Sequence, residues 1–320
     1  MEGETVSMTG GAEEAKEPAT HTEAPPWIDP TVGRSQVVIA LFVTLLISRL
    51  PEIVARELLS LDVPWMGWAI VGLTIGLWAA ARVVPVLRTL ERFLAVMVAV
   101  NLLIAILPVL LEGSLWQSLV PESTAPMVAL LATRVLYSVL GLLVLGWAML
   151  LGASRRELFA RVGELNAETR TRRKDGTYLR WRRFGSIAML FLVALVVWVG
   201  FPILPSTFDL GASLPAIAIG AIAALLNAFW EETAFRAGPL SMLQRAIGPG
   251  AGVMVLALFF GIGHFYGAIP SGPMGLVATG AVALLLGRAM IETRGLAWPV
   301  ALHFSIDFVI FTFLAIASEA

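Results

Sequence analysis

Hydrophobic residues form long, nearly uninterrupted runs along this chain, and polar residues gather in the connections between them. A helix needs about 20 apolar residues to cross the ~30 Å hydrocarbon layer of a bilayer. Runs near that length cover residues 36–50, 65–86, 92–111, 127–152, 186–204, 212–235, 250–268, 274–290 and 296–316. The first and eighth runs are short, so the pattern predicts an all-α, polytopic membrane protein with about eight or nine transmembrane helices.

Composition leads to the same conclusion. Hydrophobic residues make up 58% of the chain and charged residues 14%, whereas soluble domains average about 45–50% and about 25%. The net charge of −1 argues against a nucleic-acid partner. The chain has no cysteine, which excludes disulfides, thiolate metal sites and a cysteine nucleophile. We therefore expect an integral, multi-pass protein whose surroundings are the lipid bilayer.

Polar segments divide the chain. Residues 1–34 are rich in Glu, Thr, Pro and Gly and predict a disordered cytoplasmic tail. Residues 35–153 form a four-helix N-terminal membrane region, 154–185 a basic cytoplasmic loop, and 186–320 a second membrane region. The first apolar run lacks a basic flank and a small-residue cleavage site, so we expect no cleavable signal peptide.

The charge of the connections predicts the orientation. Residues 154–184 hold nine arginines and one lysine against four acids. The positive-inside rule places this loop and the N-terminus in the cytoplasm, and the C-terminus outside if there are nine spans. Basic residues beside a span also attract anionic lipid. In the first membrane region Arg134 lies within a span, and we interpret it as structural, hydrogen-bonded to backbone or to Asn101.

The second membrane region holds ionisable residues that are out of place in lipid, where such a residue costs about 2.5–3.5 kcal/mol or more. They are Glu231, Glu232, Arg236, His264, His303 and Asp307. Glu232 and Arg236 are four apart, so on a helix they share a face and are able to form an ion pair. Glu231 is turned by about 100° from Glu232 and lacks that partner. His303 and Asp307 are also four apart, so the carboxylate is able to orient the imidazole.

A helical hairpin brings the first of these residues together. The midpoint between Glu231 and His264 falls beside the helix-breaking "GPG" at 248–250. If this triplet is the turn of an antiparallel hairpin, Glu231 and His264 lie at the same height on facing helices. His303 lies about eight residues past Gly295, or roughly 12 Å into the last span, and can share that plane.

Three motifs then carry a resemblance to a family. "EETAFR" at 231–236 resembles the E-E-x-x-x-R motif of the CAAX-processing and bacteriocin-processing (CPBP, Abi-type) intramembrane proteases, the relatives of the prenyl-protein endopeptidase Rce1. "FGIGH" at 260–264 is similar to their F-x-x-x-H motif, and "HFSID" at 303–307 to their H-x-x-x-N/D motif. The resemblance covers about residues 215–315, in the family's order, and implies that residues 186–320 are an intramembrane protease core.

The resemblance implies hydrolysis of a peptide bond inside the membrane by activated water. Glu231 would be the general base and His264 would help it to activate water. His303 and Asp307 would support the oxyanion, while Glu232 and Arg236 would be a supporting ion pair. It implies no cofactor. We expect the bacterial inner (plasma) membrane as the location, and a peptide or membrane-protein substrate, with peptides, bacteriocin precursors and membrane-protein tails all open.

Asp307 departs from many family members, which have asparagine at this position. An ionised aspartate would repel an oxyanion, so Asp307 is protonated, orients His303 or binds a metal. The last option is a zinc site made by Glu231, His264, His303 and Asp307. Against zinc, the chain has no H-E-x-x-H motif and the resemblance points to a metal-independent reaction.

Other functions are compatible with parts of this pattern. Each histidine alone is typical of a hydrogen-bonded packing residue, and the Glu232–Arg236 pair alone is typical of a helix end at the interface. A transporter also places acids and histidines in the membrane, but it predicts polar residues in both halves and inverted repeats, and neither is visible in the sequence. A non-catalytic membrane scaffold is the remaining alternative, although the motif residues are intact.

Overall fold

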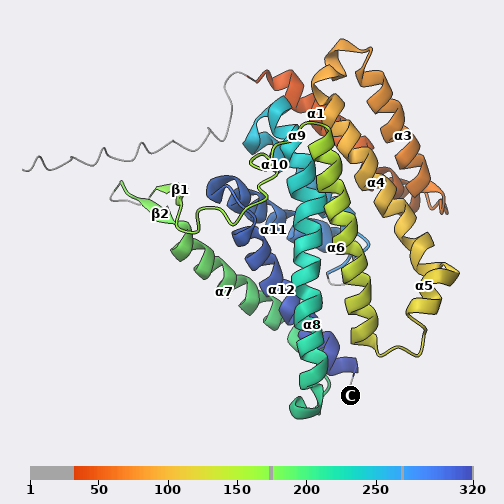
Figure 1. Cartoon of the computed structure of the whole chain (residues 1–320), viewed down its shortest axis with the longest axis vertical. Helices are drawn as coiled ribbons and strands as arrows, with labels where there is room; N and C mark the ends of the chain where they lie inside the picture. The colour runs from red at the N-terminus through yellow and green to blue at the C-terminus, as the bar shows by residue number, and fades with distance from the viewer. Residues whose placement is uncertain (1–31, 173–175, 268–269, 319–320) are drawn as a thin grey trace, which may run out of the picture.

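The structure is a computed structural model, and it describes residues 32–172, 176–267 and 270–318. Most of these residues are helical (Figure 1). The predicted disordered tail, residues 1–34, lies outside the described residues except for its last three positions.

Two groups of helices follow one another along the chain. The first group comprises α1 (Arg34–Leu46), α2 (Leu50–Ile53), the π-helix η1 (Val54–Leu58), α3 (Met66–Ala81), the 3-10 helix η2 (Pro85–Leu90), α4 (Glu91–Glu112), α5 (Ser114–Leu119) and α6 (Pro126–Leu150). The second group comprises α7 (Trp181–Gly200), the 3-10 helix η3 (Phe201–Ile203), α8 (Leu210–Glu231), the π-helix η4 (Glu232–Ala237), α9 (Gly238–Ile247), α10 (Pro249–Gly263), α11 (Gly272–Thr293) and α12 (Ala297–Ser318).

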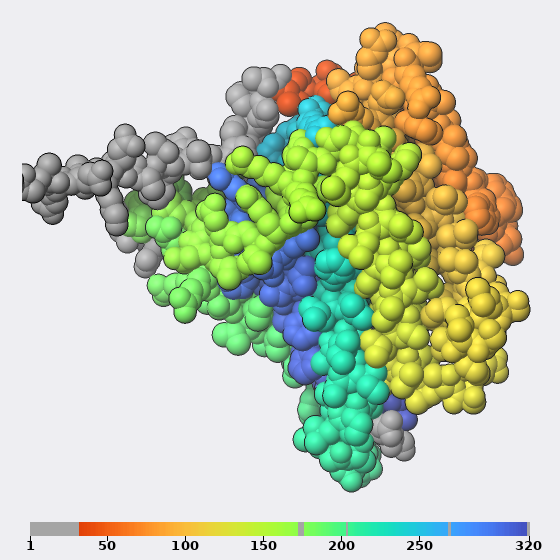
Figure 2. Space-filling model, viewed as in Figure 1, coloured from red at the N-terminus to blue at the C-terminus, as the bar shows by residue number. Residues whose placement is uncertain are grey.

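The connection between the two groups is more ordered than the loop predicted for 154–185. Strands β1 (Glu168–Arg172) and β2 (Tyr178–Arg180) form an antiparallel hairpin within it. Before the hairpin, the chain that follows α6 crosses one face of the molecule, where it is drawn in yellow-green (Figure 2). The all-α, polytopic prediction is thus confirmed, with one small hairpin added.

The predicted number of spans is wrong. Among the described residues six helices are long and apolar enough to cross a membrane, or up to seven if the bent pair α1 and α2–η1 counts as one span. Two predicted spans are too short, because α3 has 16 residues and α10 has 15. At 1.5 Å per residue these helices measure only about 24 Å and about 22 Å, less than the ~30 Å hydrocarbon layer. The protein is therefore an integral, multi-pass membrane protein with fewer than eight spans in its described part.

Proline explains two places where a predicted span is interrupted, the bend between α1 and α2 and the end of α3. Pro51 stands in the first turn of α2, and α1 and the α2–η1 segment meet at 54°. Pro85 opens the 3-10 turn η2, soon after α3 ends at Ala81. Proline lacks a backbone N–H and disfavours a helical residue before it, so an apolar run that contains proline need not be one straight helix.

The long helices of both groups pack side by side. In Figure 1, α6 and α8 run along the long axis, with α12 behind α8. Helices α3, α4 and α5 lie on one side of this centre, and α7 with the β-hairpin lies on the other. Large apolar side chains face outward, for example Leu150, Trp198 and Phe191 at 81%, 75% and 65% exposure. Such an exterior suits lipid, where helices satisfy their own backbone hydrogen bonds.

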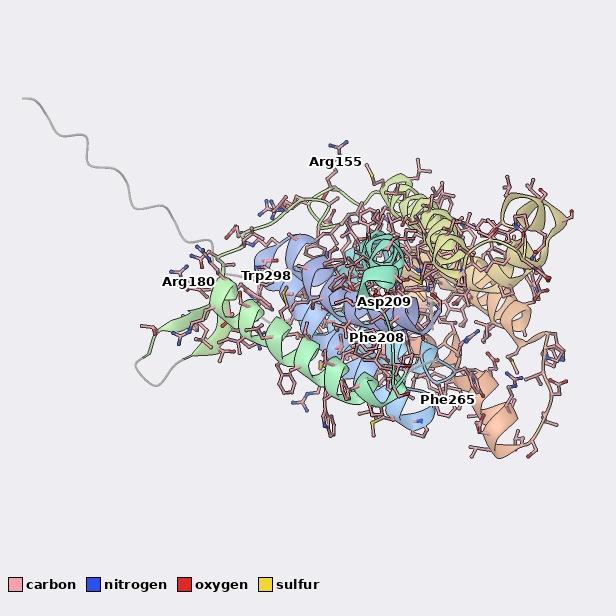
Figure 3. All side chains as sticks on the ribbon, turned by 90° about the horizontal axis from the view of Figure 1, so that it is seen from below. Arg155, Arg180, Phe208, Asp209, Phe265 and Trp298 are labelled. Atoms are coloured by element: carbon pink, nitrogen blue, oxygen red, sulfur yellow. The ribbon has the colours of Figure 1, made fainter. Side chains whose placement is uncertain are left out.

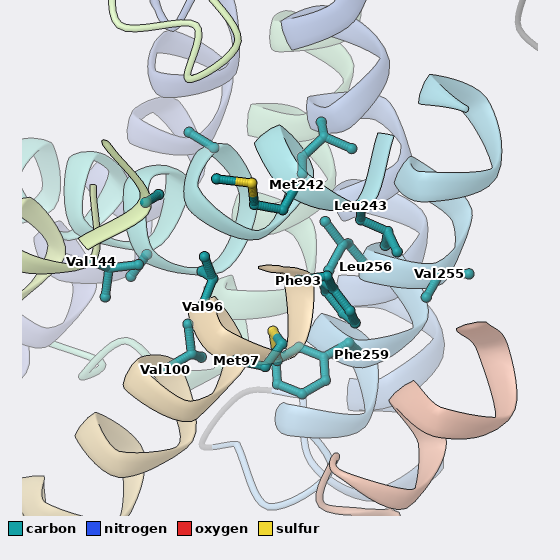
Figure 4. Close-up of a cluster of buried hydrophobic side chains, with 14 of the residues drawn as sticks. Phe93, Val96, Met97, Val100, Val144, Met242, Leu243, Val255, Leu256 and Phe259 are labelled. Carbon is teal, nitrogen blue, oxygen red and sulfur yellow. The ribbon is translucent and has the colours of Figure 1, made fainter. Parts of the chain in front are cut away.

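The main buried cluster joins the two groups (Figure 4). Side chains of α4, such as Phe93 and Met97, meet Leu243 of α9 and Leu256 and Phe259 of α10. The short α9–α10 hairpin is therefore enclosed by helices of the first group. Burial of this apolar surface fixes the position of the second group's hairpin relative to α4.

A fully buried carboxylate anchors the β-hairpin at one end of the bundle. Glu292, at the end of α11, accepts hydrogen bonds from Trp181 Nε1 (2.8 Å) and from Arg288 Nε (2.9 Å). The backbone N–H of Arg170 in β1 also donates to it (3.3 Å). Trp181, the first residue of α7, is completely buried. This cluster attaches both the hairpin and α7 to α11.

Figure 3 shows the bundle from below, with the side chains of Arg155 and Arg180 pointing outward from its periphery. Trp298 donates from Nε1 to the Leu165 carbonyl (2.9 Å). Asp209 caps α8, and its side chain accepts from the backbone N–H of Gly211 (2.7 Å).

Candidate active site

The first motif lies where α8 changes into a π-helix. The helical path runs from Leu210 to Ile247, and the π segment η4 covers Glu232–Ala237, the residues "ETAFRA". A π turn is rare, and it is frequent at functional sites because it widens the helix and re-aims side chains. The sequence pattern does not distinguish this turn from an ordinary helical turn, so the prediction missed it.

The predicted ion pair forms and is buried. Glu232 Oε1 contacts Arg236 Nη1, and the two side chains are 0% and 4% exposed. His303 of α12 adds a third member, because its Nδ1 donates to Glu232 Oε1 at 2.8 Å. The Arg236 guanidinium also lies 5.1 Å from the ring centre of Phe260. The Glu232–Arg236 pair thus links the first motif to the second through Phe260 and to the third through His303.

Glu231 has a different environment from its neighbour. Its side chain is 15% exposed and it pairs with no arginine. Its Oε1 accepts a hydrogen bond from Asn227 Nδ2 (3.2 Å), and its Oε2 lies 3.6 Å from His303 Nε2. The two adjacent glutamates therefore differ: Glu232 is fully buried and paired with charged groups, whereas Glu231 is partly exposed and hydrogen-bonded to the amide of Asn227.

Asn227 connects the two carboxylates and was missed in the sequence. Besides Glu231, its Nδ2 donates to Asp307 Oδ2 at 2.8 Å. Asp307 Oδ2 lies 3.5 Å from His303 Nε2, as expected for residues four apart on α12. The available signal was the spacing, because Asn227 stands four residues before Glu231 on α8 and so shares its helix face.

His264 lies at the end of α10, beside this cluster but not bonded to it among the described residues. Its Nδ1 donates to the Phe260 carbonyl oxygen (2.9 Å), which leaves Nε2 as the nitrogen with a free lone pair. The Phe260 ring lies 4.3 Å from the His264 ring and 6.4 Å from the His303 ring, centre to centre. The Phe260 ring therefore packs against both imidazole rings, and its backbone carbonyl accepts the hydrogen bond from His264.

The hairpin prediction is confirmed. Helix α9 ends at Ile247, Gly248 has a φ of +78° at the turn, and α10 begins at Pro249. Phe235 and Phe260 are equally distant from this turn, and their ring centres are 6.1 Å apart. The turn is therefore where the sequence predicted it, with Phe235 and Phe260 as a facing pair, and the shared height of Glu231 and His264 stays a prediction from the same midpoint.

A cavity of about 850 Å³ reaches His264 from the first group of helices. Apolar side chains such as Ile104, Phe235 and Phe260 form part of its wall, together with Tyr137 of α6. Neither Glu231 nor His303 is among the lining residues. The first group, for which the sequence predicted no specific role, therefore builds most of the space in front of His264.

Arg134 does not have the partner that the sequence predicted. Asn101 instead donates to the Ile47 carbonyl (3.0 Å) and to Thr74 Oγ1 (2.9 Å). The Arg134 guanidinium contacts two aromatic rings, those of Tyr137 and Phe311, at 5.2 and 5.7 Å. The interpretation as a residue hydrogen-bonded to Asn101 is wrong.

The described residues contain no group of three or more His, Asp or Glu side chains arranged to hold a metal ion. The four residues of the zinc alternative are split, since Glu231, His303 and Asp307 meet around His303 Nε2 while His264 is held by Phe260. The geometry therefore gives the zinc alternative no support.

The tip of the α9–α10 hairpin is bonded to the segment that follows α6. Arg245 donates from Nε to Glu157 Oε1 (2.7 Å) and from Nη2 to the Gly152 carbonyl (2.9 Å). This bond to Arg245, more than the bonds from Ser154, lowers the pKa of Glu157 to about 2, although burial opposes the shift. The segment that follows α6 thus holds the end of α9, the helix that continues from the first motif to the turn at Gly248.

Comparison with known proteins gives one match. Residues 212–309 match the family described as "Rce1-like: Type II CAAX prenyl endopeptidase Rce1-like". No curated protein and no solved structure matches the chain. The matched residues begin in α8 and end in α12, so they contain all three motifs and the helices that bring them together.

Proposed function

Residues 212–309 belong to the Rce1-like family, and from this premise we propose that the protein is an intramembrane endopeptidase in which Glu231 and His264 activate water. The match itself supports a CAAX-protease-like membrane protein at the level of the family. The proposal adds the residues, their roles and a metal-independent reaction.

One observation carries the assignment of roles, namely the contrast between Glu231 and Glu232. Glu232 is completely buried and engaged by Arg236 and His303. A buried carboxylate in contact with both Arg236 and His303 has a structural role, because protonation would break its ion pair with Arg236. Glu231 has no arginine partner and is partly open, so it is the carboxylate free to take a proton from water.

The proposed reaction begins at the water. Glu231 removes one proton, and His264 Nε2, whose lone pair is free, orients the same water. The water oxygen then attacks the scissile carbonyl carbon, and the peptide C–N bond breaks as the proton passes from Glu231 to the leaving amine. Each step transfers a proton between groups present in the chain, its substrate or water, so no redox partner is required.

His303 and Asp307 are proposed to support the negative charge on the carbonyl oxygen. Because His303 Nδ1 donates to Glu232, its Nε2 donates to an oxyanion only when the ring carries both protons. Asp307 accepts from Asn227 and lies 3.5 Å from His303 Nε2. These contacts favour Asp307 as a residue that orients His303 over Asp307 as a direct hydrogen-bond donor to the oxyanion.

The cavity in front of His264 gives the first group of helices a role. We place the substrate peptide there, because the apolar wall suits a membrane-protein segment or another apolar peptide. A peptide or membrane-protein substrate, and no nucleic acid, remains the proposal for the partners of this protein.

Location and orientation are also part of the proposal. The nine arginines of residues 154–184 favour a cytoplasmic position for this connection in a bacterial inner membrane. The N-terminus would then be cytoplasmic as well. Since the chain has no native cysteine, single cysteines at 245–249 should react with a membrane-impermeant thiol reagent only from the cytoplasmic side.

A cleavage assay tests the function. The purified protein in lipid nanodiscs is incubated with a library of random decapeptides, and new termini are detected by mass spectrometry. Glu231→Gln keeps the shape of the side chain but cannot take a proton, so turnover should fall by about 10²- to 10⁴-fold while the protein stays folded. Glu292→Gln, a change at a buried glutamate outside the motifs, is the matched control and should still cleave.

Undiminished cleavage by Glu231→Gln would remove Glu231 from the mechanism. Absence of cleavage by the wild type, together with solute uptake into vesicles that depends on Glu231, would replace the protease by a transporter.

A further inference from the structure

Arg134 is a charged residue in the membrane-embedded interior that the proposed reaction does not use. It belongs to α6, eight residues after Pro126, or about 12 Å from the start of that helix. Met127, Ser138 and Gly141, at helical spacing from it, are buried residues of the same helix. Arg134 therefore lies on the face of α6 that packs inside the bundle and not on the lipid-facing side.

The contacts of Arg134 leave at least one of its hydrogen-bond donors, the buried Nε, unused. Within the part of the chain that the structure describes, it has no ion pair and its buried Nε has no hydrogen-bond partner. The rings of Tyr137 and Phe311 lie against the guanidinium, at 5.2 and 5.7 Å, and the Asp307 carboxylate interacts with it electrostatically without an ion pair or hydrogen bond. A cation–π contact is worth about 0.5–2 kcal/mol, which is small against the cost of an arginine at membrane depth, about 2.5–3.5 kcal/mol or more.

The other interior arginines differ in this respect. Arg236 contacts Glu232, and Arg288 donates to Glu292 at 2.9 Å. Each of these two arginines is thus neutralised by a carboxylate on its own helix. Arg134 differs because no carboxylate of the described residues is within ion-pair distance of it; Asp307 acts on it only at longer range, so its position has room for a further anion.

Arg134 lies close to the proposed reaction centre. Phe311, one of its two rings, is four residues past Asp307 on α12, which is about one helical turn. Tyr137, the other ring, packs on Trp230 with ring centres 5.4 Å apart, and it lines the cavity that reaches His264. The guanidinium is thus placed between the cavity wall and the Asp307 end of the cluster.

From this placement we infer that Arg134 binds a carboxylate of the substrate about two residues from the scissile bond. The distance follows from geometry, since one helical turn is roughly 5.4 Å and an extended peptide advances about 3.3–3.6 Å per residue. A planar guanidinium matches a carboxylate in a paired, charge-assisted hydrogen bond. The inference rests on the proposed function and makes Arg134 a specificity residue of that site.

Two parts of a peptide supply such a carboxylate, the free C-terminus and the side chain of Asp or Glu. A peptide cleaved by the wild type in the library assay is therefore synthesised in matched forms. One form has a C-terminal carboxylate, one a C-terminal amide, and in a third every Asp and Glu is replaced by Asn and Gln. If Arg134 no longer increases kcat/KM for one of these forms, the carboxylate missing from that form is the one that Arg134 binds.

The kinetic test compares the wild type with Arg134→Met and Arg134→Lys. Loss of a hydrogen-bonded charge pair should lower kcat/KM for the carboxylate form by about 10- to 100-fold in Arg134→Met, mainly through KM. For the form without that carboxylate the ratio should change by less than about 3-fold. Arg134→Lys keeps the charge and should fall between the two.

A control arginine guards against a general effect. Arg82 at the end of α3 also faces a ring, that of Trp78 at 4.5 Å, but it lies away from the cluster and pairs with Glu91. Arg82→Met should change kcat/KM equally little for all peptide forms. A uniform loss for every form in Arg134→Met, or a loss that depends only on anionic lipid in the nanodisc, would overturn the inference.

Binding provides a readout that needs no turnover. Immobilised Glu231→Gln protein is exposed to the random decapeptide library in its free-acid and amidated versions. It should retain the version that carries the recognised carboxylate, and the preference should disappear in Glu231→Gln/Arg134→Met. If the preference persists without Arg134, the inference fails while the protease stands. If the wild type shows no cleavage, the proposed function fails, and the binding comparison still reports on Arg134.

Discussion

Among the residues that the structure describes, two carboxylate side chains, those of Glu232 and Glu292, are completely buried, and each has an arginine four residues away on its own helix. Glu232 pairs with Arg236 inside the membrane region, and Glu292 pairs with Arg288 at the end of α11. Both carboxylates are thus buried and paired, although Arg236 is 4% exposed and Arg288 is 27% exposed. The neighbours differ, because Glu232 is next to an imidazole and two further acids, whereas Glu292 is next to Trp181 and the β-hairpin.

The difference shows what separates a reactive site from a structural anchor. Around Glu232, His303 Nε2 lies within 3.6 Å of both Glu231 and Asp307, so several groups able to move protons share one small volume. Around Glu292, the other partners are an indole N–H, a backbone N–H and arginines, which donate hydrogen bonds but do not move protons at neutral pH. A buried Glu–Arg pair becomes a functional hypothesis only when titratable neighbours surround it.

The largest predicted effect follows from removing each carboxylate in turn. Glu232→Gln should lower the free energy of unfolding by about 3–5 kcal/mol, because it strands the buried Arg236, and should abolish cleavage because His303 loses its partner. Glu292→Gln should cost less, about 1–3 kcal/mol, since Arg288 and Arg170 are 27% and 26% exposed and water hydrates them. It should leave cleavage near wild type.

Thermal unfolding and cleavage rates of both variants, measured in the same nanodiscs, check this comparison. Loss of activity in Glu292→Gln equal to that in Glu232→Gln would show that the two clusters are not functionally distinct.

A smaller effect is expected at Asn227, the bridge between Glu231 and Asp307. Asn227→Ala should lower kcat by about 10- to 100-fold through misplacement of the base, with KM and the unfolding temperature little changed. Asn227→Gln, which keeps an amide, should lose less. Steady-state kinetics of the two variants tests this, and a change confined to KM would assign Asn227 to substrate binding instead.

Asp307 should tolerate substitution if it orients His303. Asn in Asp307→Asn has the same volume and keeps an acceptor for the Asn227 amide, so cleavage should stay near or above the wild-type rate, and chelators should have little effect. A metal ligand behaves differently, because a neutral amide binds zinc far more weakly than a carboxylate. Stoichiometric metal in the wild type, lost together with activity in Asp307→Asn, would establish the zinc mechanism.

The smallest effect concerns a surface pair. Because Arg245 lowers the pKa of Glu157 from 4.5 to about 2, the folded state favours the ionised carboxylate. The stability from this pair is fully present above about pH 4.5 and is lost as the pH falls toward 2. Glu157→Gln should therefore lower the unfolding temperature slightly at pH 7, where an exposed pair is worth about 0–1 kcal/mol, and by less at pH 3, where part of the contribution is already lost.

Unfolding curves at several pH values test this small effect. Glu122→Gln, at a glutamate with no ion pair or hydrogen bond among the described residues, is the control and should show no such pH dependence. A difference between Glu157→Gln and wild type that grows toward pH 3 would contradict the assignment.

Helical periodicity was sufficient to predict the pairs within one helix and the hairpin register. Glu232 with Arg236, His303 with Asp307, and the turn at Gly248 all follow from spacing along a helix. The same spacing also marks Arg288 and Glu292, yet that pair was overlooked because its partners, Trp181 and the hairpin, come from distant parts of the chain.

Other features lay beyond the sequence pattern for physical reasons. Hydropathy counts apolar residues but not helix breaks, so the short α3 and α10 were predicted as full spans. A π turn such as η4 has no distinct residue pattern, since it depends on packing around the helix. The environment of Arg134 depends on Phe311, which is far away in sequence, and no spacing rule predicts that contact.

The most direct test of the account follows the oxygen of water. Library peptides are cleaved in ¹⁸O-labelled water under single-turnover conditions, and the masses of the products with new carboxyl termini are measured by mass spectrometry. The account predicts one ¹⁸O atom at each new terminus with the wild type, and about 10²- to 10⁴-fold slower appearance of such termini with a correctly folded Glu231→Gln variant. Labelled termini formed at the wild-type rate by Glu231→Gln would contradict it.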